Sequence, residues 1–171
     1  MEFARDEREA QLNTLMLRYE KDVLRVCCAI LRDASLAQDA VQETFIKAYR
    51  KLDGFRGDSS EKTWLMHIAI NTCRDMRRSA WFRFMDRRVS LEALPEPVAE
   101  PTREHELLTL AVMRLPRREL EAVLLRYDQG MQVREIAQAL GISPSAVSQR
   151  LKHAHERLRR ELEGGECDVE A

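Results

Sequence analysis

A set of polar side chains near the C-terminus combines hydrogen-bonding groups with a spacing that places them on one face of a helix. These residues are Ser145, Gln149, Lys152, His153 and Glu156. The flanking arginines could meet phosphates, and they are Arg150, Arg157, Arg159 and Arg160. Hydroxyl, amide, imidazole and cationic groups of this kind can hydrogen-bond to base edges in the major groove of DNA. For any single member, solvated helix surface is the alternative interpretation. The prediction therefore depends on the elements that present the whole set.

The residues around this polar face predict a helix-turn-helix over Val133–Leu151. Gly141 stands where a left-handed turn is needed, and glycine adopts positive φ without steric cost. Ser143 and Pro144 suit the N-cap and the first turn of the second helix. The apolar positions with helical spacing are Ile136, Ala137 and Leu140 before the turn, and Val147, Leu151, Ala154 and Leu158 after it. DNA binding is the favoured interpretation, and a helical hairpin with a solvated face is the alternative.

A second polar face is expected on a helix from about Glu61 to Phe84. Its apolar side carries Trp64, Leu65, Ile68, Thr72 and Met76, and its polar side carries His67, Asn71, Arg74 and Arg78. A cationic face backed by apolar residues suits a platform for nucleic acid, because arginine can pair with phosphates and stack on bases. Taken alone, this segment is explained equally well as an ordinary amphipathic helix.

Further helices are predicted on the N-terminal side of these two. Apolar residues recur at helical spacing over Leu12–Leu31, and Ser35 with Gln38 predicts the capping box of the next helix. The segment Asp53–Asp58 contains two glycines and predicts a loop, whose last residue forms a capping pair with Glu61.

The C-terminal half begins after a change in composition. Residues 86–102 contain three prolines and several glutamates, which predicts an acidic, flexible linker. Helical periodicity resumes at Leu107. Pro116 suits the first turn of the following helix, whose apolar face is expected to include Tyr127 and which Gly130 should end.

The predicted fold class is all-α, with two small helical domains. The expected division is 1–85 and 103–163 as the domains, 86–102 as the linker and 164–171 as a disordered tail. The formal net charge is −1, but residues 62–88 carry a cluster of lysine and arginine, so charge does not exclude nucleic acid as a partner.

Other functional classes find little support in the sequence. The histidines, His67, His105, His153 and His155, lie on separate segments with no nucleophile or metal constellation, so we expect no catalysis, no cofactor and no metal. The cysteines, Cys27, Cys28, Cys73 and Cys167, lack zinc-site spacing, and the adjacent pair is expected to be buried, with a redox role as the alternative. No signal peptide or membrane-spanning run is evident, which predicts a cytoplasmic protein without membrane insertion.

The order of motifs along the chain resembles the extracytoplasmic-function subgroup of bacterial RNA polymerase sigma factors. Five segments resemble the second region of these proteins: Asp39–Phe45, Ala48–Arg50, Phe55–Gly57, Thr63–Leu65 and Ile68–Asn71. The later Leu115–Pro116 and the helix-turn-helix resemble the fourth region. The resemblance extends from about Tyr19 to Leu162.

This resemblance implies a set of partners and site residues. Asp39, Gln42 and Glu43 would dock on core RNA polymerase. Phe55, Arg56, Asp58, His67, Asn71, Arg74 and Arg78 would engage the minus-ten element as single-stranded non-template DNA with a flipped base. Ser145, Ser148, Gln149, Arg150, Lys152 and His153 would read the duplex minus-thirty-five element. The linker would thread toward the active centre of the polymerase, and an anti-sigma factor is the implied regulator.

A stand-alone helix-turn-helix repressor or activator is the competing hypothesis. Its N-terminal half would serve dimerisation or sensing, and it would bind double-stranded operator DNA unaided. Such a protein has no need of the segments Asp39–Phe45 and Phe55–Asn71, which therefore favour the sigma factor.

Overall fold

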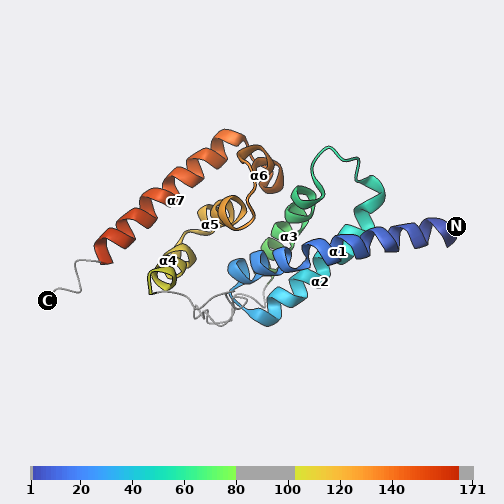
Figure 1. The fold of residues 1–171 in the computed structure, drawn as a ribbon, viewed down its shortest axis with the longest axis horizontal. Coiled ribbons are helices and arrows are strands. Elements are labelled where there is room, and N and C mark those ends of the chain that lie inside the picture. Colours follow the sequence, from blue (N-terminus) through green and yellow to red (C-terminus); the bar gives the residue numbers. More distant parts are fainter. Residues whose placement is uncertain (1, 80–102, 166–171) are drawn as a thin grey trace. The chain divides into compact units, whose positions relative to one another are not determined.

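The computed structural model describes residues 2–79 and 103–165, and within these ranges it contains helices and no strand (Figure 1). The N-terminal range forms α1 (Glu2–Leu31), α2 (Ala34–Lys51), the 3-10 turn η1 (Leu52–Gly54) and α3 (Glu61–Arg78). The C-terminal range forms α4 (Arg103–Arg114), α5 (Arg117–Val123), the π-helical turn η4 (Leu124–Asp128), α6 (Val133–Leu140) and α7 (Pro144–Gly165). The all-α prediction is confirmed. The proposed linker at 86–102 and residues 166–171 of the proposed tail lie outside the described residues. Gly164 and Gly165, predicted as the start of the tail, instead belong to α7.

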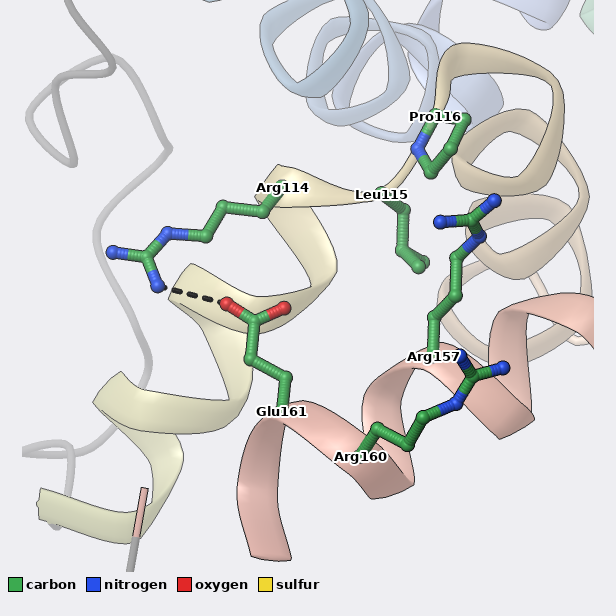
Figure 2. A pocket seen from close by; sticks show the side chains of 6 residues that line it. All are labelled: Arg114, Leu115, Pro116, Arg157, Arg160 and Glu161. Atoms are coloured by element: carbon green, nitrogen blue, oxygen red, sulfur yellow. Dashed lines mark hydrogen bonds and ion pairs between the residues drawn. The ribbon is translucent and has the colours of Figure 1, made fainter. Parts of the chain in front are cut away.

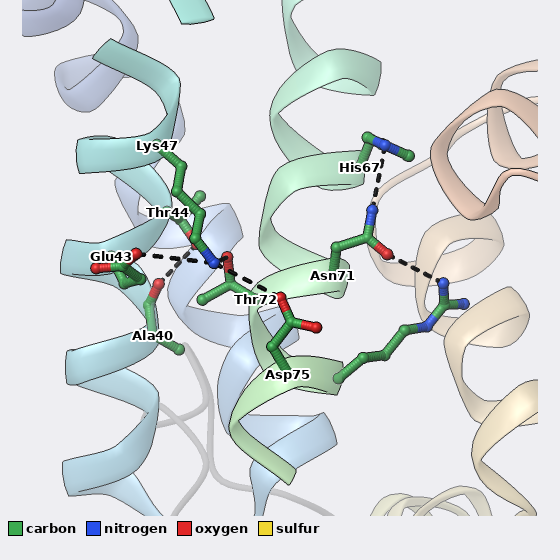
Figure 3. Close-up of polar contacts among 9 residues, drawn as sticks. Ala40, Glu43, Thr44, Lys47, His67, Asn71, Thr72 and Asp75 are labelled. Carbon is green, nitrogen blue, oxygen red and sulfur yellow. Dashed lines mark hydrogen bonds and ion pairs between the residues drawn. The ribbon is translucent and has the colours of Figure 1, made fainter. Parts of the chain in front are cut away.

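The N-terminal unit is a three-helix core in which α1, α2 and α3 all pack against one another. Val23, Val26 and Ile30 of α1 are fully buried, as are Leu65 and Ile70 of α3. The contributions of α2 include Ala37, Ala40 and Ala48, small residues that allow close approach of the helix backbones. Thr44 is also fully buried, and its hydroxyl donates to the Ala40 carbonyl at 2.6 Å, so this polar group is satisfied within α2 (Figure 3).

The turn between α1 and α2 corrects the predicted capping box. Arg32 adopts φ of 59° and its N–H donates to the Cys28 carbonyl at 2.8 Å, which ends α1. The chain then becomes extended at Asp33, whose carboxylate accepts from the Leu36 N–H at 2.8 Å. Asp33 is therefore the N-cap of α2, and Ser35 lies exposed in the first turn.

α3 begins at Glu61 as predicted, but its N-cap and its C-terminal end differ from the sequence prediction. Ser60, not Asp58, caps the start of the helix, because its hydroxyl accepts from the Thr63 N–H at 3.1 Å. At the other end the backbone turns extended at Ser79, so the helix ends at Arg78, six residues before the predicted Phe84. Residues 80–84 lie outside the described residues.

The C-terminal unit contains a π-helical turn that the sequence analysis did not predict. Pro116 stands at the N-cap of α5, one residue earlier than expected, and η4 follows directly on α5. A π-helical turn takes in extra residues and rotates the side chains that follow. Tyr127 is accordingly 61% exposed and is not part of the apolar face, which corrects that expectation. Gly130, with φ of 67°, then reverses the chain.

The predicted helix-turn-helix is confirmed in its turn chemistry. Gly141 adopts φ of 68°, and the Ser143 hydroxyl accepts from the Ala146 N–H at 3.2 Å. Pro144 is the first residue of α7. The apolar stripe of α7 is buried at Val147, Leu151 and Ala154 and half-buried at Leu158.

Three thiols meet in the core of the N-terminal unit. Cys27, Cys28 and Cys73 are buried, and the Sγ atoms of Cys27 and Cys73 lie 3.5 Å apart, across the contact between α1 and α3. The hydrogen bond with Cys73 and burial both raise the pKa of the Cys27 thiol, and burial raises that of Cys28. Raised pKa values favour the neutral, unreactive thiol, which supports a structural role.

Replacing Asp33 with alanine should lower the free energy of unfolding by about 1 kcal/mol, because the Leu36 N–H loses its acceptor. Ser35→Ala is the matched control and should leave stability nearly unchanged, since alanine suits an exposed helix position. Urea denaturation followed by circular dichroism measures both. A loss confined to Ser35→Ala would show that the cap has been assigned to the wrong residue.

The core thiols should resist modification in the native protein. In a Cys167→Ser background, the reaction with Ellman's reagent at pH 8 should be at least about 100-fold slower than in urea. All three thiols are buried, and the raised pKa values of Cys27 and Cys28 favour their neutral form. Comparable rates in the native and the unfolded protein would contradict a structural role.

Candidate nucleic-acid interface

The polar face of α7 holds most of the predicted base-reading residues. Ser145, Gln149, Lys152 and His153 are exposed, on the side opposite the buried stripe. Ser148 is exposed too, but its hydroxyl donates to the Pro144 carbonyl at 3.1 Å within the helix. Arg150 is half-buried at the border of the face. One helix thus presents four exposed side chains, of which Ser145 also forms a hydrogen bond with the Ser143 hydroxyl at 3.0 Å.

Arg157, a predicted phosphate contact, instead has a structural partner. Its guanidinium lies 3.1 Å from the Glu119 carboxylate, whose side chain is only 11% exposed. Arg114 and Glu161 form a second bridge, at 2.8 Å, between α4 and α7. These ion pairs fix the orientation of α7 on the elements that precede it.

A small pocket lies where α4 and α7 approach each other (Figure 2). Its volume is about 320 Å³. Leu115 and Pro116 supply its apolar lining, and Arg114, Arg157, Arg160 and Glu161 supply the polar lining. The lining includes no cysteine, serine or histidine that could act as a nucleophile or base. Among the described residues, no group of three or more potential ligands could hold a metal ion, and no helix is long and apolar enough to cross a membrane.

Tyr127 and His155 form a contact at the edge of the α7 face that sequence reasoning missed. The Tyr127 hydroxyl lies 2.7 Å from His155 Nε2, and the ring centroids are 5.7 Å apart. His155 follows Ser148 by seven residues and Lys152 by three, so it shares their side of the helix. Assigning Tyr127 to the apolar face concealed this pair, and the π-helical turn that exposes it leaves no clear sequence signal.

The second predicted platform forms a connected polar row along α3 (Figure 3). The Asn71 amide donates to His67 Nε2 at 3.1 Å, and Arg74 donates to the Asn71 side-chain oxygen at 3.3 Å. All three side chains are half-buried, so each still presents surface to solvent. Arg78 is exposed at the end of the helix. The shared face predicted for these four residues is confirmed.

The loop before α3 is held by an aromatic contact. Phe55 packs on Trp64, with centroids 4.8 Å apart and an interplanar angle of 36°. Arg56 and Asp58 are exposed on either side of Gly57, which adopts φ of 76°. Trp64 therefore anchors the loop as well as contributing to the apolar side of α3.

The third predicted set lies on α2 and is partly engaged within the protein. Asp39 and Gln42 are exposed. Glu43 lies 3.7 Å from Lys47, which also lies 3.7 Å from Asp75 of α3 (Figure 3). Ile46 is 45% exposed, and its position seven residues after Asp39 places it on the same face. Sequence reasoning missed Ile46, because an isoleucine in a helix is ordinarily assigned to the core.

Comparison with known proteins identifies the family. Residues 15–83 match the family model for Sigma-70 region 2, and residues 105–158 match Sigma-70, region 4. The chain is 31% identical to the RNA polymerase sigma-H factor of Pseudomonas aeruginosa, covering 87% of this chain and 84% of that protein. It is also 31% identical to the RNA polymerase sigma factor CarQ of Myxococcus xanthus, covering 99% of this chain and 98% of that protein.

A solved structure shares the fold. The sigma factor RpoE, in complex with the anti-sigma factor NepR from Bartonella quintana, has a TM-score of 0.72 at 21% identity, over 94% of this chain and 99% of that chain. Fold, family models and relatives agree with the motif order along the sequence. The chain therefore belongs to the RNA polymerase sigma factors of the sigma-70 family, in the extracytoplasmic-function subgroup.

Proposed function

We propose that this sigma factor directs promoter-specific transcription through three surfaces, one that docks on core RNA polymerase and two that contact promoter DNA. The observation that carries this assignment is that each unit presents its own polar helix face, the α3 row in one and the α7 face in the other. A repressor that reads duplex DNA through α7 would have no use for the α3 row. We assign the two activities to residues 1–85 and 103–163, with 86–102 as the connection.

The docking surface is the exposed side of α2 formed by Asp39, Gln42, Glu43 and Ile46. Their spacing of three, four and seven residues places them together. The resemblance to the family implies a basic partner surface on the polymerase, which suits carboxylates. Ile46 adds an apolar centre, and a desolvated apolar contact ringed by polar groups is typical of the residues that dominate binding energy. Asp39 makes no hydrogen bond or ion pair within the described part of the chain, so its charge is free for a partner.

The minus-ten surface comprises the loop from Asp53 to Ser60 and the polar row of α3. Arg56 and Asp58 extend from the loop, where they could contact a base that leaves the stack. Flipping a base costs a few kcal/mol, which contacts in the site must offset. The row of His67, Asn71 and Arg74 is already ordered by its own hydrogen bonds, so it would lose little side-chain entropy on meeting the strand.

The minus-thirty-five surface is the exposed face of α7. Gln149, Lys152 and His153 are the side chains best placed to reach base edges in a major groove. The contacts of Ser148 and Arg157 within the unit favour positioning roles for these two residues.

An anti-sigma factor is the proposed regulator. Two related folds were solved as complexes, RpoE with the anti-sigma factor NepR and CnrH with the cytosolic domain of CnrY. A partner that covers α2 from Asp39 to Phe45, the face of α7, or both would block function without unfolding the protein. Such a partner should compete with core polymerase.

Charge reversal at Asp39 tests the docking surface. Asp39→Lys should weaken association with core RNA polymerase by at least about tenfold, because like charges would then face each other. Glu20→Lys on α1 is the matched control, since it changes the same charge at another exposed position. Co-elution with core enzyme and run-off transcription measure the effect, and circular dichroism confirms folding. Glu43→Lys should also disturb Lys47 and is therefore the less specific variant.

Unchanged co-elution of Asp39→Lys would assign its carboxylate to solvated surface. A core-independent, tight footprint of the chain on duplex promoter DNA would favour the repressor hypothesis over the whole proposal.

Variants in the two DNA surfaces should impair different steps of transcription initiation. Asn71→Ala should slow promoter opening, and the paired variant Gln149→Ala with Lys152→Ala should weaken initial duplex binding. A pre-melted template should rescue the opening rate of Asn71→Ala but not the duplex binding of the paired variant. Stopped-flow fluorescence with reconstituted holoenzyme separates the steps. Equal rescue of both would contradict the division of labour between α3 and α7.

A further inference from the structure

The helix α1 extends beyond the residues that the family model of Sigma-70 region 2 matches. It begins at Glu2, whereas that match begins at residue 15. The first turns of α1 therefore lie outside the part of the chain that this family model describes. Arg8 lies in these first turns. It contacts the C-terminal end of α2 and the turn η1, where the minus-ten loop begins.

Three contacts join Arg8 to that point. Its Nη2 donates to the Tyr49 backbone carbonyl at 2.9 Å, and its Nη1 lies 3.1 Å from the Asp53 carboxylate. Its guanidinium carbon also lies 4.7 Å from the centroid of the Tyr49 ring. Tyr49 belongs to the last turn of α2, and Asp53 belongs to η1, which leads directly into the loop.

The chemistry of a helix end explains why an arginine suits this position. The Tyr49 carbonyl accepts from the Leu52 N–H at the end of α2, and its second lone pair remains available to Arg8. The negative end of the helix dipole also attracts a cation. The Arg8 side chain is 32% exposed whereas that of Asp53 is 67% exposed, so solvent screens the ion pair more than the carbonyl bond. A planar guanidinium can serve the carbonyl, the carboxylate and the ring together, which a lysine ammonium cannot.

The same helix also contacts the far end of the loop. Arg18 of α1 lies 2.9 Å from Glu61, and Asp22 of α1 lies 3.3 Å from Lys62, at the first residues of α3. Between these two attachments, the contact of Phe55 with Trp64 fixes the loop near its start. Within the part of the chain that the structure describes, the segment around Gly57 is the stretch of the loop that lacks such an anchor.

We infer that Arg8 is a positioning residue for promoter opening, which orders the minus-ten loop from outside the residues that match Sigma-70 region 2. This inference rests on the proposed function of the loop. Arg8 touches no DNA in this role. It acts by holding Tyr49 and Asp53, which fixes the position where the loop begins. Arg56 and Asp58 are then already ordered when they meet the strand, so that less conformational entropy is lost on binding.

Limited trypsin digestion of the free full-length protein tests the effect on the loop directly. Arg56 is a tryptic site in the exposed loop, and cleavage there requires the loop to open. Arg8→Ala should raise the rate of cleavage after Arg56 at least threefold, Arg8→Lys should give an intermediate rate, and Lys21→Ala, which removes an exposed cation elsewhere on α1, should leave it unchanged. Thermal denaturation should show nearly unchanged global stability.

Binding of a single-stranded minus-ten oligonucleotide by the holoenzyme provides the functional arm. Arg8→Ala should weaken it roughly three- to tenfold, with partial retention by Arg8→Lys and an unchanged affinity for core enzyme. Unchanged cleavage and binding in Arg8→Ala, or equal losses in Lys21→Ala, would overturn the inference. If Asn71→Ala weakens oligonucleotide binding and Arg8→Ala does not, only the role of Arg8 is refuted. If neither variant weakens oligonucleotide binding, the minus-ten assignment itself is refuted.

Discussion

The burial of one side of α3 against α1 and α2 is the constraint on which the N-terminal unit depends. Leu65, Met66 and Ile70 are fully buried there, and Cys73 meets Cys27 of α1 in the same core. Because this side of α3 is buried in a close-packed core, where side chains have few alternative arrangements, the helix can rotate little about its axis. The row of His67, Asn71 and Arg74 is therefore turned outward at a fixed angle.

In the C-terminal unit, ion pairs help to fix the orientation of the helix that bears the polar face. Glu119 and Glu121 are buried acids on α5, and they are paired with Arg157 and Arg117. Removing Arg157 would leave the buried carboxylate of Glu119 without its cation, although the loss is smaller than for a fully buried pair because Arg157 is half exposed. The pair between Glu119 and Arg157 joins α5 to the helix that would read DNA. Stability of the unit and the direction of the α7 face are thereby linked.

Periodicity in the sequence predicted the features that depend on burial. The all-α class and the buried stripe of α7 follow from apolar spacing, and the turn at Gly141 follows from the freedom of glycine to adopt positive φ. The shared polar face of α3 could be predicted for the same reason. Each of these features depends on residues within one or two helical turns of each other.

The errors and omissions arise where the outcome depends on local geometry or on distant partners. Asp33 caps α2 in preference to Ser35 because Arg32 takes a left-handed conformation that no motif announces. Tyr127 is exposed because a π-helical turn changes the helical phase. The ion pair of Lys47 with Asp75 and the contacts of Arg8 join residues that are far apart in sequence. The spacing of charged residues alone carries no information about such pairs.

Site-specific crosslinking in the reconstituted holoenzyme shows whether the two units contact different parts of the promoter in different states. A photoreactive amino acid would replace Asn71 in one protein and Lys152 in another. The account predicts crosslinks from position 71 to the non-template strand of the minus-ten element only after melting, and from position 152 to the duplex minus-thirty-five element before and after melting. Crosslinks from position 71 to intact duplex, or from both positions to the same element, would contradict it.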